Sequence, residues 1–73
     1  MTFSKRLRVY RSPRGHVTAS LVGGPSSLSV IQIMKPDTKS KLTDKPREWE
    51  EALDKLEVKA IKQLRELYKK EAQ

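Results

Sequence analysis

The first half of the chain contains three short segments in which apolar and polar residues alternate, as they do in half-buried β-strands. These segments are 5–11, 16–22 and 27–34. In the second segment Val17, Ala19 and Leu21 share one side, while Thr18 and Ser20 share the other. Both connections are too short for a crossover, so we expect antiparallel hairpins. The alternation therefore predicts a three-stranded antiparallel sheet.

The third segment differs from the other two because it is apolar on both sides. Val30, Ile31 and Ile33 follow one another with only Gln32 between them. Strands of this kind are typical of the centre of a sheet or of a sheet covered on both faces. We therefore expect this segment in the middle of the sheet or beneath a second layer.

The second half has a helical period. Apolar residues recur there at steps of three and four, with no interrupting Gly or Pro. They are Trp49, Leu53, Leu56, Ala60, Leu64 and Leu67. Thr43 or Asp44 can cap a helix whose first turn accommodates Pro46. We expect a helix over about 45–71, preceded by an exposed and mobile linker over 35–43, where no period is visible.

These elements together predict the fold class α+β: a three-stranded antiparallel sheet followed by one long C-terminal helix packed on it. The 73 residues are enough for a single small domain, 1–73. A core of this size contributes little net stability, so a partner complex would stabilise it further.

The basic excess of the chain is confined to its first part. Residues 1–45 contain nine Lys and Arg against two acidic residues, whereas residues 46–73 contain seven of each. The whole formal net charge of +7 therefore belongs to the predicted sheet and linker. Such an excess favours association with nucleic acid, an anionic lipid surface or an acidic protein face.

The first candidate binding site is the outward side of the first strand together with the following turn. It comprises Lys5, Arg6, Arg8, Tyr10, Arg11, Arg14 and His16. Guanidinium groups match the geometry of phosphates, and a tyrosine ring can stack on a base. The same charges would suit an acidic protein partner, or would protect an exposed edge strand from aggregation. Acidic residues are almost absent from this region, so we favour a binding role.

The length of the predicted helix gives a second candidate. It would measure about 40 Å, whereas the strands span roughly 20–27 Å. Its last turns must therefore extend beyond the sheet, contact the N-terminal segment or meet a partner. The apolar stripe is expected to cover the sheet, although its spacing also approximates a coiled-coil seam. The second partner surface is predicted at Leu64, Leu67 and Tyr68.

The residues needed for several kinds of chemistry are missing. The chain has no Cys and one His, which excludes thiol nucleophiles and metal sites built from Cys or from several His. We therefore expect neither an enzyme nor a metal or other cofactor. No apolar run is long enough for a bilayer span or for the core of a signal peptide. We expect a cytoplasmic protein that is monomeric when free and makes no membrane contact.

The run from Arg6 to His16, followed by short strands and a charged helix, resembles the small lytic-phage regulators of bacterial RNA polymerase in length, charge and layout. The resemblance implies a non-enzymatic transcription regulator in the host bacterial cytoplasm. Such proteins bind a terminal segment of a large polymerase subunit, inhibit the use of host promoters and cause antitermination. The resemblance carries over no individual functional residue.

The order of the elements also resembles the arm-type DNA-binding domains of phage and transposon integrases, in which the sheet enters the major groove. This resemblance implies instead a stand-alone nucleic-acid-binding domain. The residues contacting the groove and the phosphates would then be Arg6, Arg8, Tyr10, Arg11 and Arg14.

Overall fold

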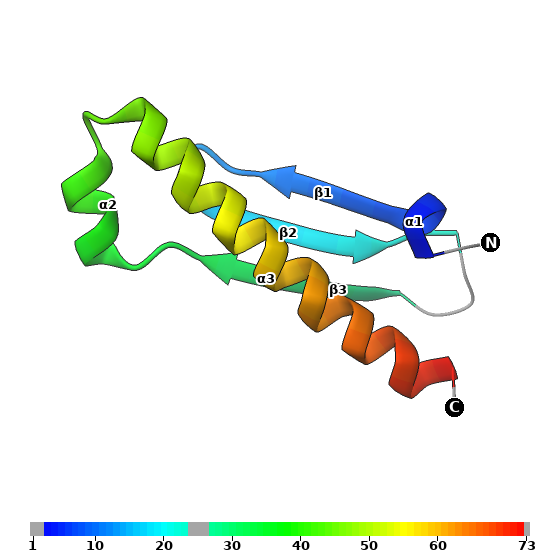
Figure 1. Cartoon of the computed structure of the whole chain (residues 1–73). Helices are drawn as coiled ribbons and strands as arrows, with labels where there is room; N and C mark the ends of the chain where they lie inside the picture. Colours follow the sequence, from blue (N-terminus) through cyan, green and yellow to red (C-terminus); the bar gives the residue numbers. More distant parts are fainter. Residues whose placement is uncertain (1–2, 24–26, 73) are drawn as a thin grey trace.

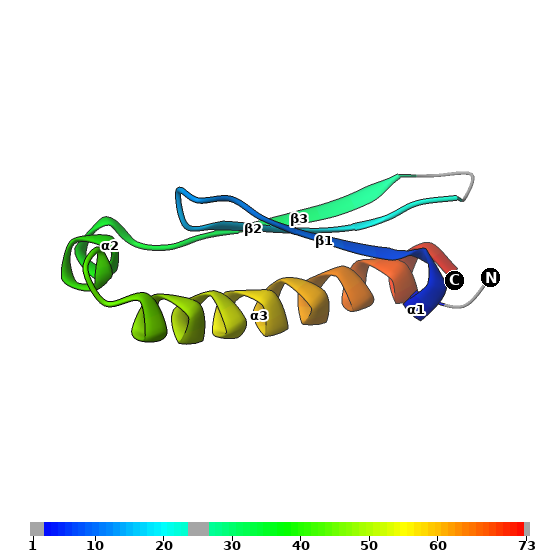
Figure 2. The ribbon, with the colours of Figure 1, turned by 90° about the horizontal axis from the view of Figure 1, so that it is seen from above.

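The computed structural model describes residues 3–23 and 27–72, which form two layers (Figure 1). The sheet consists of β1 (Leu7–Arg11), β2 (His16–Leu21) and β3 (Leu28–Ile33). The long helix α3 (Pro46–Ala72) lies along one side of it (Figure 2). Two short helices, α1 (Phe3–Arg6) and α2 (Pro36–Leu42), lie at opposite ends. The expected α+β fold is confirmed.

The strand order is β1-β2-β3, and both pairs are antiparallel. β2 is therefore the central strand and β3 lies at an edge. The expectation that the third strand occupies the centre or lies under a second layer is wrong, since the side chains of Ile31 and Ile33 are 59% and 58% exposed. Burial against the described residues does not explain why β3 is apolar on both sides.

The core lies between α3 and the sheet, and it follows the predicted alternation. Val17, Ala19 and Leu21 of β2 are buried, and Leu53 and Leu64 of α3 are buried opposite them. α3 packs over β2 and β3, which leaves β1 outside most of its footprint. The apolar side of the sheet and the apolar stripe of the helix therefore cover each other as the sequence predicts.

A tight turn between β1 and β2 places the sheet against the beginning of α3. Gly15 has a φ of +86°, a conformation that residues with a Cβ rarely adopt. A Cβ at this position would also lie 3.2 Å from Met34 Cβ and 3.3 Å from Trp49 Cη2. Glycine thus meets both the backbone and the packing requirement of the turn.

Residues 36–42 form a helix instead of the mobile linker expected over 35–43. Pro36 begins this helix, where its missing N–H costs little. Asp37 lies in the first turn and Lys39 and Lys41 lie in the last turn, where the helix dipole favours their charges. The Thr43 hydroxyl donates to the Lys39 carbonyl oxygen at 2.6 Å. Seven residues with little apolar content give no readable period, which is why the sequence pattern missed them.

The N-terminal segment packs against the end of α3. β1 begins at Leu7, two residues later than expected, because the preceding residues form α1. The rings of Phe3 and Tyr68 lie 5.5 Å apart, and the Arg65 guanidinium lies 4.9 Å from the centre of the Phe3 ring. Of the three outcomes considered for the last turns of the helix, contact with the N-terminal segment is the one observed.

Among residues 3–23 and 27–72, no helix combines the length and the apolar character that crossing a membrane requires.

Candidate functional site

The side of the sheet that faces away from α3 has no described element over it (Figure 2). We call it the open face. The side chains assigned to it by alternation are Arg8, Tyr10, His16, Thr18, Ser20, Ser29, Ile31 and Ile33.

An apolar strip crosses the middle of the open face. The strand register places Tyr10 opposite Thr18, and Thr18 opposite Ile31. Directly opposed side chains in a sheet have Cβ atoms about 5 Å apart, so these three residues are contiguous. Tyr10 is 67% exposed, and Ile33 adds a second exposed isoleucine next to Ile31 on the same strand face. The open face therefore exposes the side chains of Tyr10, Ile31 and Ile33 around the half-buried Thr18.

Three members of the first candidate binding site lie on the open face: Arg8, Tyr10 and His16. The Arg8 guanidinium donates to the carbonyl oxygens of Lys5 and Leu7, which holds it near its own strand. His16 is half-buried opposite Ile33. Of the other predicted members, Arg14 is exposed in the β1–β2 turn and Lys5 is exposed on α1.

Arg6 belongs to the first candidate binding site, but its side chain makes contacts within the fold. Its Nε donates to the Val22 carbonyl oxygen at 3.0 Å, and its guanidinium carbon lies 5.8 Å from the centre of the Tyr68 ring. Arg6, the last residue of α1, therefore ties the chain just before β1 to the residue after β2 and to α3.

Arg11 faces α3, so its predicted place on the outward side of β1 is wrong. Its Nη2 lies 2.6 Å from Asp54 Oδ1 and 2.9 Å from Glu57 Oε1, and its Nη1 lies 3.1 Å from Glu50 Oε2. The hydrogen bonds to Asp54 and then to Glu57 raise the pKa of Arg11 above its ordinary value, against a smaller lowering by desolvation. Alternation accounts for the placement, because Arg11 shares the parity of Leu7 and Val9.

The three residues of the second predicted partner surface also differ in how far they are exposed. Leu64 is 0% exposed and packs in the core with Ala19, Leu21 and Ala60, so its expected role at a partner surface is wrong. Tyr68 is half-buried against that core and the Phe3 ring. Leu67, at 39% exposed, is the member of the set that remains accessible.

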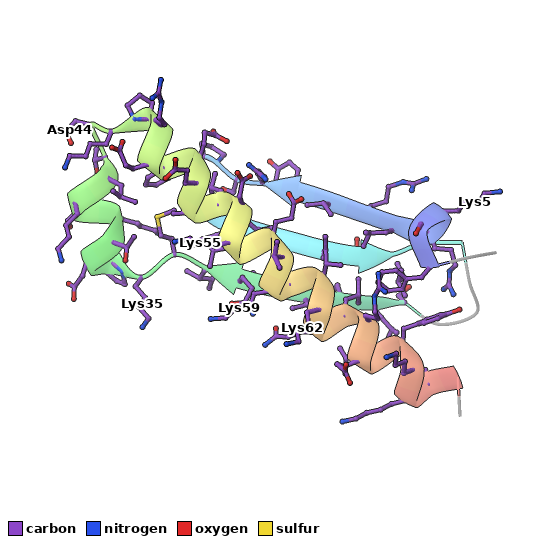
Figure 3. The ribbon with its side chains drawn as sticks, viewed as in Figure 1. Lys5, Lys35, Asp44, Lys55, Lys59 and Lys62 are labelled. Atoms are coloured by element: carbon purple, nitrogen blue, oxygen red, sulfur yellow. The ribbon has the colours of Figure 1, made fainter. Side chains whose placement is uncertain are left out.

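A row of basic side chains on α3 was not predicted from the sequence. Lys55, Lys59 and Lys62 lie along one side of the helix, the side on which Lys35 follows β3 (Figure 3). We call these four residues the lysine row. The acidic residues Glu50, Asp54 and Glu57 turn instead toward Arg11 on β1. Because α3 contains as many basic as acidic residues, its net charge gave no sign that the two kinds lie on different sides. The separation is visible only in the spacing: the three acidic residues and the three lysines each follow one another at steps of four and then three residues.

A groove of about 550 Å³ separates the end of β3 from α2 and α3. Met34, Ala52 and Leu56 supply apolar lining, and three members of the lysine row, Lys35, Lys55 and Lys59, also line the groove. Glu48 and Glu51 are acidic residues of the same lining. Within the described part of the chain, ion pairs are formed by Arg11 and not by these lysines.

The open face and the lysine row are both extended surfaces, which suits contact with a macromolecule. Comparisons of the chain with protein-family models, with curated proteins and with solved structures found no match.

Proposed function

We propose that the protein is a non-enzymatic transcription regulator that binds a large subunit of bacterial RNA polymerase in the host cytoplasm. Docking would inhibit host promoter use, cause antitermination, or do both. The observation that carries the docking step is the exposed strip formed by Tyr10, Thr18 and Ile31 on the open face. The choice of polymerase as the partner comes from the resemblance in length, charge and layout.

The composition of the open face supports a protein interface. Aromatic residues and arginine are enriched where proteins bind one another, and a few such residues contribute most of the binding energy. Here Tyr10 lies in the strip, with Arg8 two residues away on the same strand face. Exposed apolar side chains that gather on one face mark interaction sites more often than singly scattered ones do.

Replacing the apolar strip tests the proposal. In the double variant Tyr10→Ser/Ile31→Ser, we expect affinity for purified bacterial RNA polymerase to fall by at least about tenfold, as when interface anchors are truncated. The fold should persist because both side chains are largely exposed. Binding is measured by interferometry on immobilised polymerase, and transcription is assayed at a housekeeping promoter and across a terminator.

Val58→Ser is the matched control, since Val58 is an exposed apolar residue on α3. It should bind like the wild-type protein. A wild-type protein that neither binds polymerase nor alters transcription would rule out polymerase as the target. A double variant that binds as well as Val58→Ser would instead exclude the open face as the docking surface.

A second candidate function is nucleic-acid binding by the same face. The observation in its favour is the arrangement of the elements: a three-stranded sheet backed by one helix, with Arg8 on the uncovered side and Arg14 in the adjoining turn. This is the arrangement in which an arm-type domain would present its sheet to the major groove.

Salt dependence separates this second candidate from the first. Duplex affinity should fall with salt, with a slope of log K against log salt of about −0.9 per neutralised phosphate. The variant Arg8→Ala/Arg14→Ala should reduce the slope by about two such contacts. Arg11 is kept intact because it contacts α3. Flat isotherms on duplex and single strands at about 50 mM salt would reject nucleic-acid binding.

A further inference from the structure

The outer edge of β3 has main-chain groups aimed away from the sheet. The Met34 amide donates to the Gly15 carbonyl oxygen at 2.9 Å, in register with the β2–β3 ladder. Hydrogen-bonded and non-hydrogen-bonded pairs alternate along an antiparallel ladder. The amide and carbonyl groups of Ser29, Ile31 and Ile33 therefore point toward the free edge, where no described residue accepts or donates to them.

The two edges of the sheet differ in how they are protected. Natural edge strands carry charges, prolines or bulges that prevent pairing with another strand. β1 carries Arg8 and Arg11, whereas β3 contains no charged residue and no proline. The β3 edge is therefore the one that permits addition of a further strand.

The lysine row lies beside this edge. Lys55, Lys59 and Lys62 run along the β3 side of α3, and Lys35 follows the end of β3 (Figure 3). From Lys55 to Lys62 the helix rises roughly 10 Å, which corresponds to about three residues of an adjacent strand. Glu51 lies one helical turn before Lys55 and Glu66 lies one turn after Lys62, so acidic residues limit this positive stretch at both ends.

The charge of the row selects among possible occupants of the edge. Pairing of two β3 edges from two copies of this chain would bring two lysine rows together, which like-charge repulsion opposes. A nucleic acid would meet the lysines but has no peptide groups to pair with β3. An acidic polypeptide satisfies both the lysines and the free main-chain groups.

We propose that the β3 edge binds an extended acidic polypeptide segment, which adds to the sheet as a fourth strand with its carboxylates against Lys55, Lys59 and Lys62. Main-chain hydrogen bonds would supply affinity, and the lysine row would supply selectivity, as in other cases of strand addition. The inference goes beyond the proposed function, because it concerns the edge of β3 and not the open face. It does not depend on whether the open face binds RNA polymerase.

The test uses the 73-residue protein labelled with ¹⁵N and a blocked peptide of alternating Val and Glu, about ten residues long. The peptide should slow hydrogen exchange of the Ser29, Ile31 and Ile33 amides by at least about tenfold, since pairing protects amides that now face solvent. A peptide of alternating Val and Lys should give no protection. Protection by both peptides, by neither, or at other amides alone would overturn the proposal.

Charge reversal tests the lysine row. Lys55→Glu/Lys59→Glu should weaken binding of the acidic peptide by about tenfold, the combined effect of two reversed surface contacts. Lys69→Glu/Lys70→Glu makes the same change of charge near the end of α3 and should leave binding unchanged. Equal weakening in both variants would mean that net charge, not the row, attracts the peptide, and would overturn the proposed placement.

A proline on the edge tests the main-chain contacts. Ile31→Pro removes an outward amide without removing a bond to β2, so it should abolish protection by the peptide. Val9→Pro makes the equivalent change on the edge of β1 and should bind normally. If single-stranded DNA shifted the lysine-row signals while the acidic peptide left the edge amides unprotected, the row would be a nucleic-acid site and the inference would fail.

Discussion

Replacing Leu64 by alanine is expected to lower the free energy of unfolding by about 3–4 kcal/mol, as in other buried leucine sites that leave a cavity. Leu64 is 0% exposed and lies where α3 meets β2, against Ala19 and Leu21. Both neighbours belong to β2, the central strand of a hydrogen-bonded sheet, so they can close only part of the cavity. A domain of this size has a net stability of only roughly 4–11 kcal/mol, so the variant would lose a large part of it.

Leu67→Ala is the matched control, because Leu67 lies three residues further along the same helix and is 39% exposed. It should lose less than Leu64→Ala does, about 1–2 kcal/mol, because part of its surface already faces water and its removal leaves no enclosed cavity. Both variants are measured by urea unfolding followed by circular dichroism. Similar losses in the two variants would contradict the burial of Leu64. Leu64 would then again be a candidate for the second partner surface that was predicted from the length of the helix.

The fold was predictable where a period extends over many residues. β2 alternates over its whole length, and α3 keeps its apolar stripe from Trp49 to Leu67, so both elements were identified from the sequence. α2 was missed because its seven residues are too short and too polar for a pattern. The position of β3 was missed because apolar residues on both sides of a strand indicate two covered faces, without indicating whether the same chain covers them.

The sequence showed which residues form the candidate site, but it showed only in part on which side of the sheet each of them lies. Arg8 and Tyr10 lie on the open face as expected, whereas Arg11 lies on the helix side. The alternation of the strand distinguishes them, because Arg11 is an even number of residues from Leu7 and so lies on the same side of β1 as Leu7. Grouping the arginines by charge alone ignored this alternation. The lysine row was likewise readable from its spacing, but only the packing of α3 shows that it lies beside β3 and not beside β1.

Arg11→Met is expected to lower the free energy of unfolding by about 1–2 kcal/mol, which corresponds to a drop in Tm of roughly 5–15 °C in a domain of this size. Methionine retains apolar bulk, while Asp54, Glu57 and Glu50 lose their common cation. The loss is smaller than for a buried ion pair because Glu50 and Asp54 are largely exposed to solvent, which screens them. Thermal unfolding at low and high salt measures it, and high salt should reduce the difference.

Arg8→Met is the control for this prediction, since Arg8 donates only to carbonyl oxygens near it in the chain and contacts no carboxylate within the described residues. Its effect should stay within about 0.5 kcal/mol, as for most surface substitutions. Because the folded-state pKa of Arg11 is raised, its contribution is complete below the ordinary pKa of arginine and is lost only as pH rises through the raised value. The difference between the two variants should therefore not decline between about pH 7 and pH 9 through loss of the Arg11 proton. If Arg11→Met proved as stable as Arg8→Met, the carboxylate cluster would not hold β1 to α3, and Arg11 would again be available as a binding residue.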